Sequence, residues 1–240
     1  MRRSLFLTLL DYKRIPDYIS SLVYAAGTGI LKMRSRIYGM ISIPECVTLH
    51  KLAIGLPNNS VALEIGSYGG LSSAYLLSGL EKKNSFLYSV DPFGTNIETQ
   101  KKIVGKYNNT DYREAEYASL RRKPTKSEVS GALKNLGFSN FKLIEGYSFD
   151  VIKRWNKKID LLFIDGNHEY GAVKRDFLEW TKYLKKGGVV ILHDANNLNY
   201  LPKWNWGLEG PTKVASAFIN PPKWLNIGRV DSAVYATKNY

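Results

Sequence analysis

The sequence has little of what disulfide frameworks and membrane spans require. Its 240 residues include one cysteine, Cys46, which excludes an internal disulfide. No motif of a reactive thiol surrounds this residue, so we expect a buried free thiol in a reducing compartment. The longest apolar stretch, residues 19–31, contains serines, a threonine and two glycines and falls short of the roughly 18 apolar residues that a spanning helix needs. The sequence therefore predicts no transmembrane helix.

The N-terminus also lacks the features of a secretion signal. Residues 1–10 place two arginines before an apolar run, but that run is short and meets Asp11, Lys13 and Arg14 without a cleavage-like site. We expect a cytoplasmic protein.

Acidic residues are scarce beside basic ones. Aspartate and glutamate total 21 against 34 lysines and arginines, which gives a net charge of +13. Such a charge favours an acidic partner, whether nucleic acid, an anionic membrane surface or a phosphorylated substrate. The basic residues are scattered, with small clusters at 32–36 and 121–126, and aromatic residues are not interleaved with them as in nucleic-acid-binding proteins. We expect a mostly solvated basic surface and no specific nucleic-acid signature.

Residues 61–77 form the stretch around which the chain is organised. An apolar run, Val61–Ile65, follows polar residues and predicts a buried strand, and an apolar helix is expected to begin at about Leu71. The glycines between them permit a sharp turn and the close approach of a ligand. These glycines are Gly66, Gly69 and Gly70. A strand, a glycine loop and a helix in this order predict a nucleotide site.

The loop departs from the dinucleotide fingerprint, because Tyr68 and Leu71 stand where that fingerprint requires glycine. Glu64 lies near the end of the strand, and Asp91 ends the next predicted strand, residues 85–90. This order resembles the first two motifs of class I S-adenosylmethionine-dependent methyltransferases. The resemblance implies that Asp91 accepts hydrogen bonds from both ribose hydroxyls. It also implies that the loop wraps the methionyl part of the cofactor, through Glu64, Gly66, Ser67, Tyr68 and Gly70.

Two later predicted strands, residues 161–164 and 189–192, carry acidic and imidazole groups at their ends. Parallel strands of an open sheet present such groups at the edge where ligands bind. The side chains that follow the two strands are Asp165, Asn167, His168, His193 and Asp194. The helix between the strands has apolar residues on one face, and Gly187 and Gly188 are expected to stop it. Its apolar face comprises Val173, Phe177, Trp180 and Leu184.

This block looks like the type 24 family of class I methyltransferases. Members of that family carry aspartate, glycine, any residue and histidine after the fourth strand, a two-glycine stop, and a His-Asp pair after the fifth. With the first motif, the resemblance runs from about residue 45 to 238. Related sugar O-methyltransferases bind a divalent ion through an aspartate after strand four and two acids after strand five. The resemblance carries those ligand positions to Asp165, His193 and Asp194.

Two positions depart from this pattern. His193 stands where the sugar O-methyltransferases have an acid, and Asn167 stands where an aspartate serves them as base. His168 can act as base because its pKa lies near working pH. Two carboxylates and one imidazole suit Mn²⁺ or Zn²⁺ better than Mg²⁺. We expect Asp165, Asn167 and His168 to form the catalytic group, with Asp165 also beside the cofactor.

The third strand is predicted at residues 141–146, after a helix at 126–136 that Gly137 closes. By the resemblance, the residues after this strand flank the adenine, and the hydroxyl of Ser148 reaches a ring nitrogen. These residues are Gly146, Tyr147 and Ser148. Helix N-capping by Ser148 is the alternative.

The first 56 residues are expected to be a helical extension of one methyltransferase domain at 57–240. Within 12–40 the spacing predicts an amphipathic helix with a basic tail. Two interpretations stay open: it covers the catalytic domain or pairs two subunits in a homodimer, or it lies on an anionic membrane. Its apolar positions are Ile15, Tyr18, Ile19, Leu22, Val23 and Ala26. A second helix, with Ser42 available as its cap, is expected to end at Gly55.

Two longer segments are candidates for the acceptor side. Residues 92–127 exceed an ordinary strand-to-helix connection and form either a lid over the substrate or a helical surface elaboration. Residues 197–211 carry Tyr200, Trp204 and Trp206, whose rings either stack on a sugar or pack within the loop. Residues 224–238 predict an antiparallel hairpin.

These patterns predict a Rossmann-like α/β fold with a seven-stranded, mostly parallel sheet and an antiparallel C-terminal hairpin. The expected function is transfer of a methyl group from S-adenosylmethionine to a hydroxyl of a saccharide or glycosylated small molecule. A divalent metal (Mg²⁺ or Mn²⁺) is the candidate second cofactor. The positive charge favours a phosphorylated or acidic acceptor. An RNA methyltransferase and a non-catalytic S-adenosylmethionine-binding scaffold are the alternatives.

Overall fold

A computed structural model describes residues 15–81, 83–94, 123–196 and 209–240, and these residues form one seven-stranded sheet. Its order is β3-β2-β1-β4-β5-β7-β6. The first five strands in this order pair in parallel, whereas β7 runs antiparallel to both β5 and β6. The strands are β1 (Val61–Ile65), β2 (Phe86–Asp91), β3 (Phe141–Glu145), β4 (Ile159–Ile164), β5 (Leu184–Leu192), β6 (Trp224–Val230) and β7 (Ala233–Lys238). The predicted fold class is confirmed.

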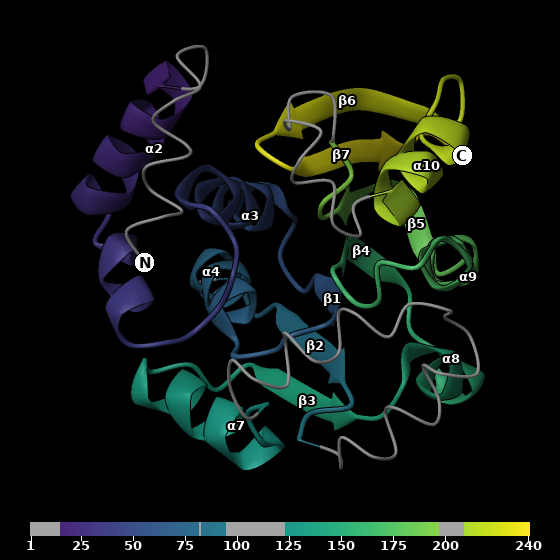
Figure 1. Cartoon of the computed structure of the whole chain (residues 1–240). Helices are drawn as coiled ribbons and strands as arrows, with labels where there is room; N and C mark the ends of the chain where they lie inside the picture. The colour runs from purple at the N-terminus through teal and green to yellow at the C-terminus, as the bar shows by residue number, and fades with distance from the viewer. Residues whose placement is uncertain (1–14, 82, 95–122, 197–208) are drawn as a thin grey trace.

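Helices cover both faces of the sheet (Figure 1). One face carries α2 (Ile15–Gly27), the 3₁₀ helix η2 (Ile30–Ser35), α3 (Ile43–Gly55), α4 (Leu71–Leu80) and α7 (Lys126–Asn135). The other carries α8 (Ser148–Val151), the 3₁₀ helix η3 (Ile152–Arg154), α9 (Tyr170–Trp180) and α10 (Glu209–Phe218). Each layer encloses its own buried apolar cluster against the sheet. The helices before β1 share the first cluster with β1, β2 and β4, so they pack as part of the same core.

The register of the central strands brings their carboxyl ends together. Ile65 of β1 pairs with Ile164 of β4, which in turn pairs with Leu192 of β5. Two backbone hydrogen bonds extend this alignment by one residue: the Asp165 N–H donates to Ile65 O at 2.8 Å, and the His193 N–H donates to Ile164 O at 3.0 Å. The chain reverses its strand order between β1 and β4, and open sheets bind ligands at such a switch point.

The expectation that Gly187 and Gly188 stop the helix before β5 is wrong. Helix α9 ends at Trp180, where the Thr181 hydroxyl donates to Phe177 O at 2.7 Å. Leu184 is buried as the first residue of β5, paired with Ile159, and both glycines lie within that strand. Trp180 and Leu184 stand four residues apart, which is also the spacing of residues on one face of a helix. The buried first residue of β5 therefore fits the apolar pattern of α9.

The interpretation of the first helix also needs correction. Ala25 is fully buried, but Ala26 is exposed, and three of the larger side chains at the predicted apolar positions point to solvent. They are Ile19, Leu22 and Val23, with exposed fractions of 53%, 36% and 66%. Ala25 is the residue of α2 within the first core cluster, which Ile30 and Met33 of η2 join directly after the helix. None of the helices in the described ranges combines the length and apolar character that crossing a bilayer requires.

Helix α3 begins as predicted. Its N-cap is Ser42, whose hydroxyl accepts the Glu45 N–H at 3.3 Å, and the Glu45 carboxylate accepts the Ser42 N–H at 2.8 Å. This reciprocal pair is a capping box, with Pro44 in the first turn. Cys46, one residue further, is the expected buried thiol, and burial raises its pKa to about 12.

Candidate active site

The glycine loop follows β1 and is pressed against two other parts of the chain. Gly66 has a φ of +88°, and a Cβ there would lie 2.1 Å from Asp165 O. A Cβ on Gly69 would lie 2.2 Å from Tyr38 O. Both glycines therefore allow backbone segments to approach each other. We expected them to admit a ligand, but contacts within the protein already require them. The contact also places the loop directly beside the end of β4.

Asp91, at the end of β2, holds this loop in place. Its Oδ2 accepts the N–H groups of Ser67 at 3.0 Å and Tyr68 at 2.9 Å, and its Oδ1 accepts the Phe93 N–H at 2.6 Å. The side chain is nearly buried. Each carboxylate oxygen can accept more than one hydrogen bond, so these contacts leave capacity for ribose hydroxyls.

Glu64 is fully buried inside β1 and joins three elements. Its Oε2 accepts hydrogen bonds from the hydroxyls of Ser73 on α4 and Ser89 on β2, whereas its Oε1 has no hydrogen-bond partner among the described residues. Burial raises the pKa of Glu64 to about 7, although the neighbouring serine hydroxyls oppose the shift. A positively charged group placed beside Oε1 would favour the ionised carboxylate.

Two further predicted cofactor positions carry buried polar atoms that lack partners within the described residues. They are the hydroxyl oxygens of Ser67 in the glycine loop and of Tyr147 after β3. Buried polar atoms are normally hydrogen-bonded. Together with Glu64 Oε1, these atoms fit a cofactor whose polar groups run along the carboxyl ends of β1 and β3.

The residues after β3 differ from expectation in one respect. The N-cap of α8 is Tyr147, so the alternative role of Ser148 as N-cap is wrong. The Ser148 hydroxyl instead donates to Oδ1 of Asp176 on α9 at 2.6 Å. Burial raises the pKa of Asp176 to about 6. Sequence reasoning missed Asp176, because a single acid on the inner face of an amphipathic helix carries no motif. Gly146, next to Tyr147, has a φ of +147°.

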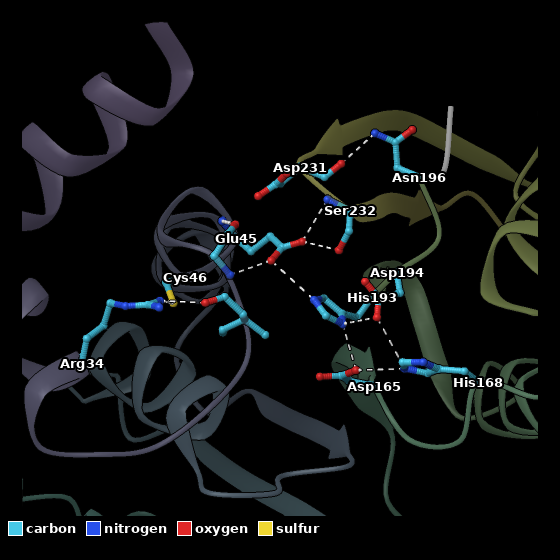
Figure 2. Close-up of polar contacts among 12 residues, drawn as sticks. Arg34, Glu45, Cys46, Asp165, His168, His193, Asp194, Asn196, Asp231 and Ser232 are labelled. Carbon is cyan, nitrogen blue, oxygen red and sulfur yellow. Dashed lines mark hydrogen bonds and ion pairs between the residues drawn. The ribbon is translucent and has the colours of Figure 1, made fainter. Parts of the chain in front are cut away.

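Four side chains meet at the ends of β4 and β5 (Figure 2). His193 Nδ1 lies 2.9 Å from Asp165 Oδ1 and 3.5 Å from Asp194 Oδ2. His168 Nε2 lies 3.7 Å from each of those two oxygens. His193 is the more deeply buried imidazole, with 8% of its side chain exposed against 29% for His168. The arrangement brings together four of the five polar residues predicted at this edge.

The charges in this four-residue cluster are coupled. Burial opposes ionisation of Asp165, but the charge of His193 and hydrogen bonds from both imidazoles outweigh it and lower its pKa to about 2. Burial likewise opposes protonation of His193, yet Asp165, Glu45 and Asp194 raise its pKa well above the usual value. For Asp194, burial dominates and raises the pKa. Asp165 thus pairs with His193, whereas burial makes the Asp194 carboxyl harder to ionise.

Asn167 is the predicted residue that the structure leaves apart from this cluster. Its amide oxygen accepts the Glu169 N–H at 2.8 Å, and the residue is exposed. Such a bond is an Asx turn, which shapes the loop before α9.

The ligand atoms of the cluster have the spacing of a metal site. One atom each from Asp165, His168 and His193 lies within 4.8 Å of the other two. Oxygen and imidazole donors in this mixture fit a divalent transition ion. The sequence placed Asp194 in the ligand set and His168 outside it, whereas the group with this spacing contains His168 and not Asp194. Asp194 lies beside both imidazoles, with its Oδ2 3.5 Å from His193 Nδ1 and 3.7 Å from His168 Nε2.

Glu45 is a further residue that the sequence did not assign here. Its Oε2 lies 3.4 Å from His193 Nε2, although the two residues are separated by 148 positions. Burial opposes its ionisation, but the charge and hydrogen bond of His193 lower its pKa to about 2. In the sequence Glu45 stands out as the acid of the Ser42 capping box, and that pattern predicts the start of a helix but no contact with His193. Most of the two candidate acceptor segments, residues 95–122 and 197–208 with Tyr200, Trp204 and Trp206, lies outside the described residues.

Comparison with known proteins agrees with this geometry. A model of the type 24 family, described as a methyltransferase domain, matches residues 63–195. An uncharacterised protein of Acanthamoeba polyphaga mimivirus is 28% identical over 146 residues, which cover 59% of this chain and 54% of that protein. The chain thus spans about half the length of this curated relative.

Solved methyltransferase structures share the fold. The O-methyltransferase TomG of Streptomyces achromogenes, involved in tomaymycin synthesis and solved with S-adenosylmethionine, superposes with a TM-score of 0.57 at 17% identity, covering 84% of this chain and 82% of its own. An rRNA methylase from Streptococcus thermophilus has a TM-score of 0.51 at 14% identity, covering 84% and 100%.

The matched segment makes up more than half of the chain and contains both the glycine loop and the four-residue cluster. The chain therefore belongs to the type 24 family of class I S-adenosylmethionine-dependent methyltransferases.

Proposed function

We propose that this protein transfers a methyl group from S-adenosylmethionine to a hydroxyl of a saccharide or glycosylated small molecule. One observation carries the proposal: two carboxylates and two imidazoles converge at the ends of β4 and β5, and the glycine loop touches the same place through Gly66 and the backbone of Asp165. A non-catalytic binding protein has no need of such a cluster, because partly buried charges are costly to assemble.

The cofactor would lie along the carboxyl ends of β1, β2 and β3. The ammonium of its methionyl part would pair with Glu64 Oε1, and its carboxylate would face the Ser67 hydroxyl and the start of α4, where helix amide groups favour anions. Asp91 would accept the ribose hydroxyls. Tyr147 and Ser148 would border the adenine, with Asp176 fixing the Ser148 hydroxyl. Gly66, Tyr68, Gly70 and Gly146 would shape the backbone around the cofactor.

Methyl transfer needs an acceptor oxygen aligned with the methyl group and a base for its proton. In the reaction the bond between oxygen and the methyl carbon forms, the bond between carbon and sulfur breaks, and the hydroxyl proton moves to His168 Nε2. His168 suits this role because it is the more exposed imidazole and Asp165 and Asp194 stabilise it once protonated. Asp165, His193 and Asp194 would hold a divalent ion, which lowers the pKa of a bound hydroxyl.

The acceptor class distinguishes this proposal from an RNA methyltransferase. The fold shared with an O-methyltransferase of tomaymycin synthesis supports a small acceptor, whereas the fold shared with an rRNA methylase and the charge of +13 leave RNA as the second candidate. The test is methyl transfer from labelled S-adenosylmethionine to a panel of glycosides and sugar phosphates, with structured RNA in parallel. Label entering RNA alone, with RNA binding that weakens steeply as salt rises, would reverse the assignment.

Replacing Asp91 with asparagine should weaken binding of S-adenosylhomocysteine by about 1.5 to 3 kcal/mol, because a charged acceptor is lost from both the loop and the ribose. Calorimetric titration measures this directly. Asp160→Asn is the matched control: Asp160 has the same 7% exposure and also accepts a backbone N–H, from Val61, but it lies at the opposite end of the sheet. Equal affinities for Asp91→Asn and Asp160→Asn would contradict the ribose role.

Chelation should abolish turnover, and Mn²⁺ or Mg²⁺ should restore it, if the ion holds the acceptor hydroxyl. Asp194→Asn should lose turnover while keeping its affinity for S-adenosylhomocysteine, because Asp194 follows β5, whereas the proposed cofactor site lies at the ends of β1, β2 and β3. Rates with and without chelator, measured on one protein preparation, decide this. Full activity in the presence of chelator would show that the reaction needs no ion, and activation of the hydroxyl would then rest on His168 as the general base.

A further inference from the structure

The carboxylate of Glu45 connects three parts of the chain that are distant in sequence. Its Oε1 accepts the N–H of Ser232 at 3.0 Å and the hydroxyl of the same residue at 2.5 Å, in the turn between β6 and β7. Its Oε2 accepts the Ser42 N–H at 2.8 Å and faces His193 Nε2 at 3.4 Å. Figure 2 shows the side chain reaching from α3 toward both the hairpin and His193. Only 5% of Glu45 is exposed.

The two nitrogens of His193 consequently face two different groups. Nε2 points to Glu45, and Nδ1 points to Asp165 at 2.9 Å and Asp194 at 3.5 Å. The ring also contacts Phe163 edge-on, with centroids 6.2 Å apart. A histidine that binds a metal through one nitrogen almost always donates the other N–H to a carboxylate or carbonyl, which fixes its tautomer and its orientation.

We propose that Glu45 is a positioning residue of the active site: it accepts the Nε2–H of His193 and so directs the Nδ1 lone pair toward a divalent ion held with Asp165 and Asp194. The inference rests on the proposed function, because it takes the ion from there. It adds a residue that neither the family match nor the metal-like spacing contains, since Glu45 and Ser232 both lie outside residues 63–195.

The capping box alone does not explain these contacts. Helix capping requires the bond between Glu45 and Ser42, but it does not require the bonds to Ser232 or the approach to His193. The identity of residue 193 supplies a reason for them. An imidazole ligand brings one negative charge fewer than a carboxylate, and the Glu45 carboxylate behind the ring restores that charge and raises the basicity of Nδ1.

The test is the affinity of the full-length protein for Mn²⁺, measured by the loss of the free-ion signal in electron paramagnetic resonance. Glu45→Gln should weaken Mn²⁺ binding roughly 10- to 100-fold and leave the affinity for S-adenosylhomocysteine unchanged. Glu45→Asp keeps the charge but draws the carboxylate back by one methylene, so it should weaken Mn²⁺ binding in the same direction if Glu45→Gln folds poorly. Ser232→Ala is the control, because it removes a hydrogen bond to Oε1 and leaves the oxygen that faces His193.

A double-mutant cycle with His193→Asn identifies the route of the effect. If Glu45 acts through His193, then Glu45→Gln should cause no further loss of Mn²⁺ affinity in the His193→Asn background. Wild-type Mn²⁺ affinity in Glu45→Gln and Glu45→Asp would overturn the role of Glu45 while leaving the ion in place. A wild-type protein that binds S-adenosylhomocysteine but no Mn²⁺ would overturn both the ion and this role, and methyl transfer through His168 would then stand by itself.

Discussion

Glu64→Gln should make the cofactor-free protein more stable at alkaline pH and at the same time weaken its cofactor binding. Burial raises the pKa of Glu64 from 4.5 to about 7, so between these pH values the folded protein binds more protons at this site than the unfolded chain does. The free energy of unfolding must therefore fall as pH rises through that window. The glutamine side chain does not titrate in this window. The free energy of unfolding of Glu64→Gln should therefore gain about 2 to 3 kcal/mol on that of wild type between pH 5 and pH 8.

The same substitution removes the anionic partner proposed for the cofactor ammonium. Affinity for S-adenosylhomocysteine at pH 8 should fall by about 1.5 to 3 kcal/mol. Denaturant unfolding at pH 5 and pH 8 measures the difference in stability, and calorimetric titration at pH 8 measures the affinity for S-adenosylhomocysteine. Glu145→Gln, an exposed glutamate at the end of β3, is the control and should change neither quantity. A stability difference that stays constant between pH 5 and pH 8 would show that Glu64 is already ionised in the free protein.

His168→Gln should lower turnover by about 10² to 10⁴ and leave cofactor affinity unchanged, because a positioned base contributes that much to proton transfer. Burial opposes protonation of His168, but its hydrogen bond with Asp165 and the charge of Asp194 raise its pKa above 6.5. A base must be unprotonated to act. Wild-type turnover should therefore rise with pH through the pKa of His168, and this rise should vanish in the variant.

His50→Gln provides the control for this histidine. His50 is also buried and hydrogen-bonded, to Ser78 Oγ at 2.7 Å, but it lies on α3 outside the cluster. The His50→Gln variant should retain wild-type turnover and the wild-type dependence of turnover on pH. Loss of Mn²⁺ affinity in His168→Gln would instead make His168 a ligand of the ion, and another group would have to take the proton.

The sequence predicted those features of the site that depend on position along a strand. Each of these polar residues directly follows an apolar run and lies at the carboxyl end of a parallel strand. Because β4 and β5 pair in parallel, Asp165 then lies beside His193. The Ser42 cap and the hairpin of β6 and β7 were predictable for the same reason, because both are local patterns.

The contacts that refine the site were not predictable, because they depend on how distant elements pack. Glu45 reaches His193 only because α3 lies against the turn between the last two strands, and its local pattern was already accounted for by the helix cap. Asp176 reads as one polar residue of an amphipathic helix. The sequence around Gly187 and Gly188 fits the end of a helix as well as the interior of a strand. The pairing of Leu184 with Ile159 places both glycines in a strand.

Calorimetric titration of the wild-type protein with S-adenosylhomocysteine at pH 7, compared with NAD⁺, tests the central claim most directly. We expect S-adenosylhomocysteine to bind and NAD⁺ not to bind. The measured heat should depend on the ionisation enthalpy of the buffer, because pairing the cofactor ammonium with Glu64 releases the proton that burial retains there. Preference for NAD⁺, or binding of neither ligand, would contradict the assignment of this glycine loop to S-adenosylmethionine.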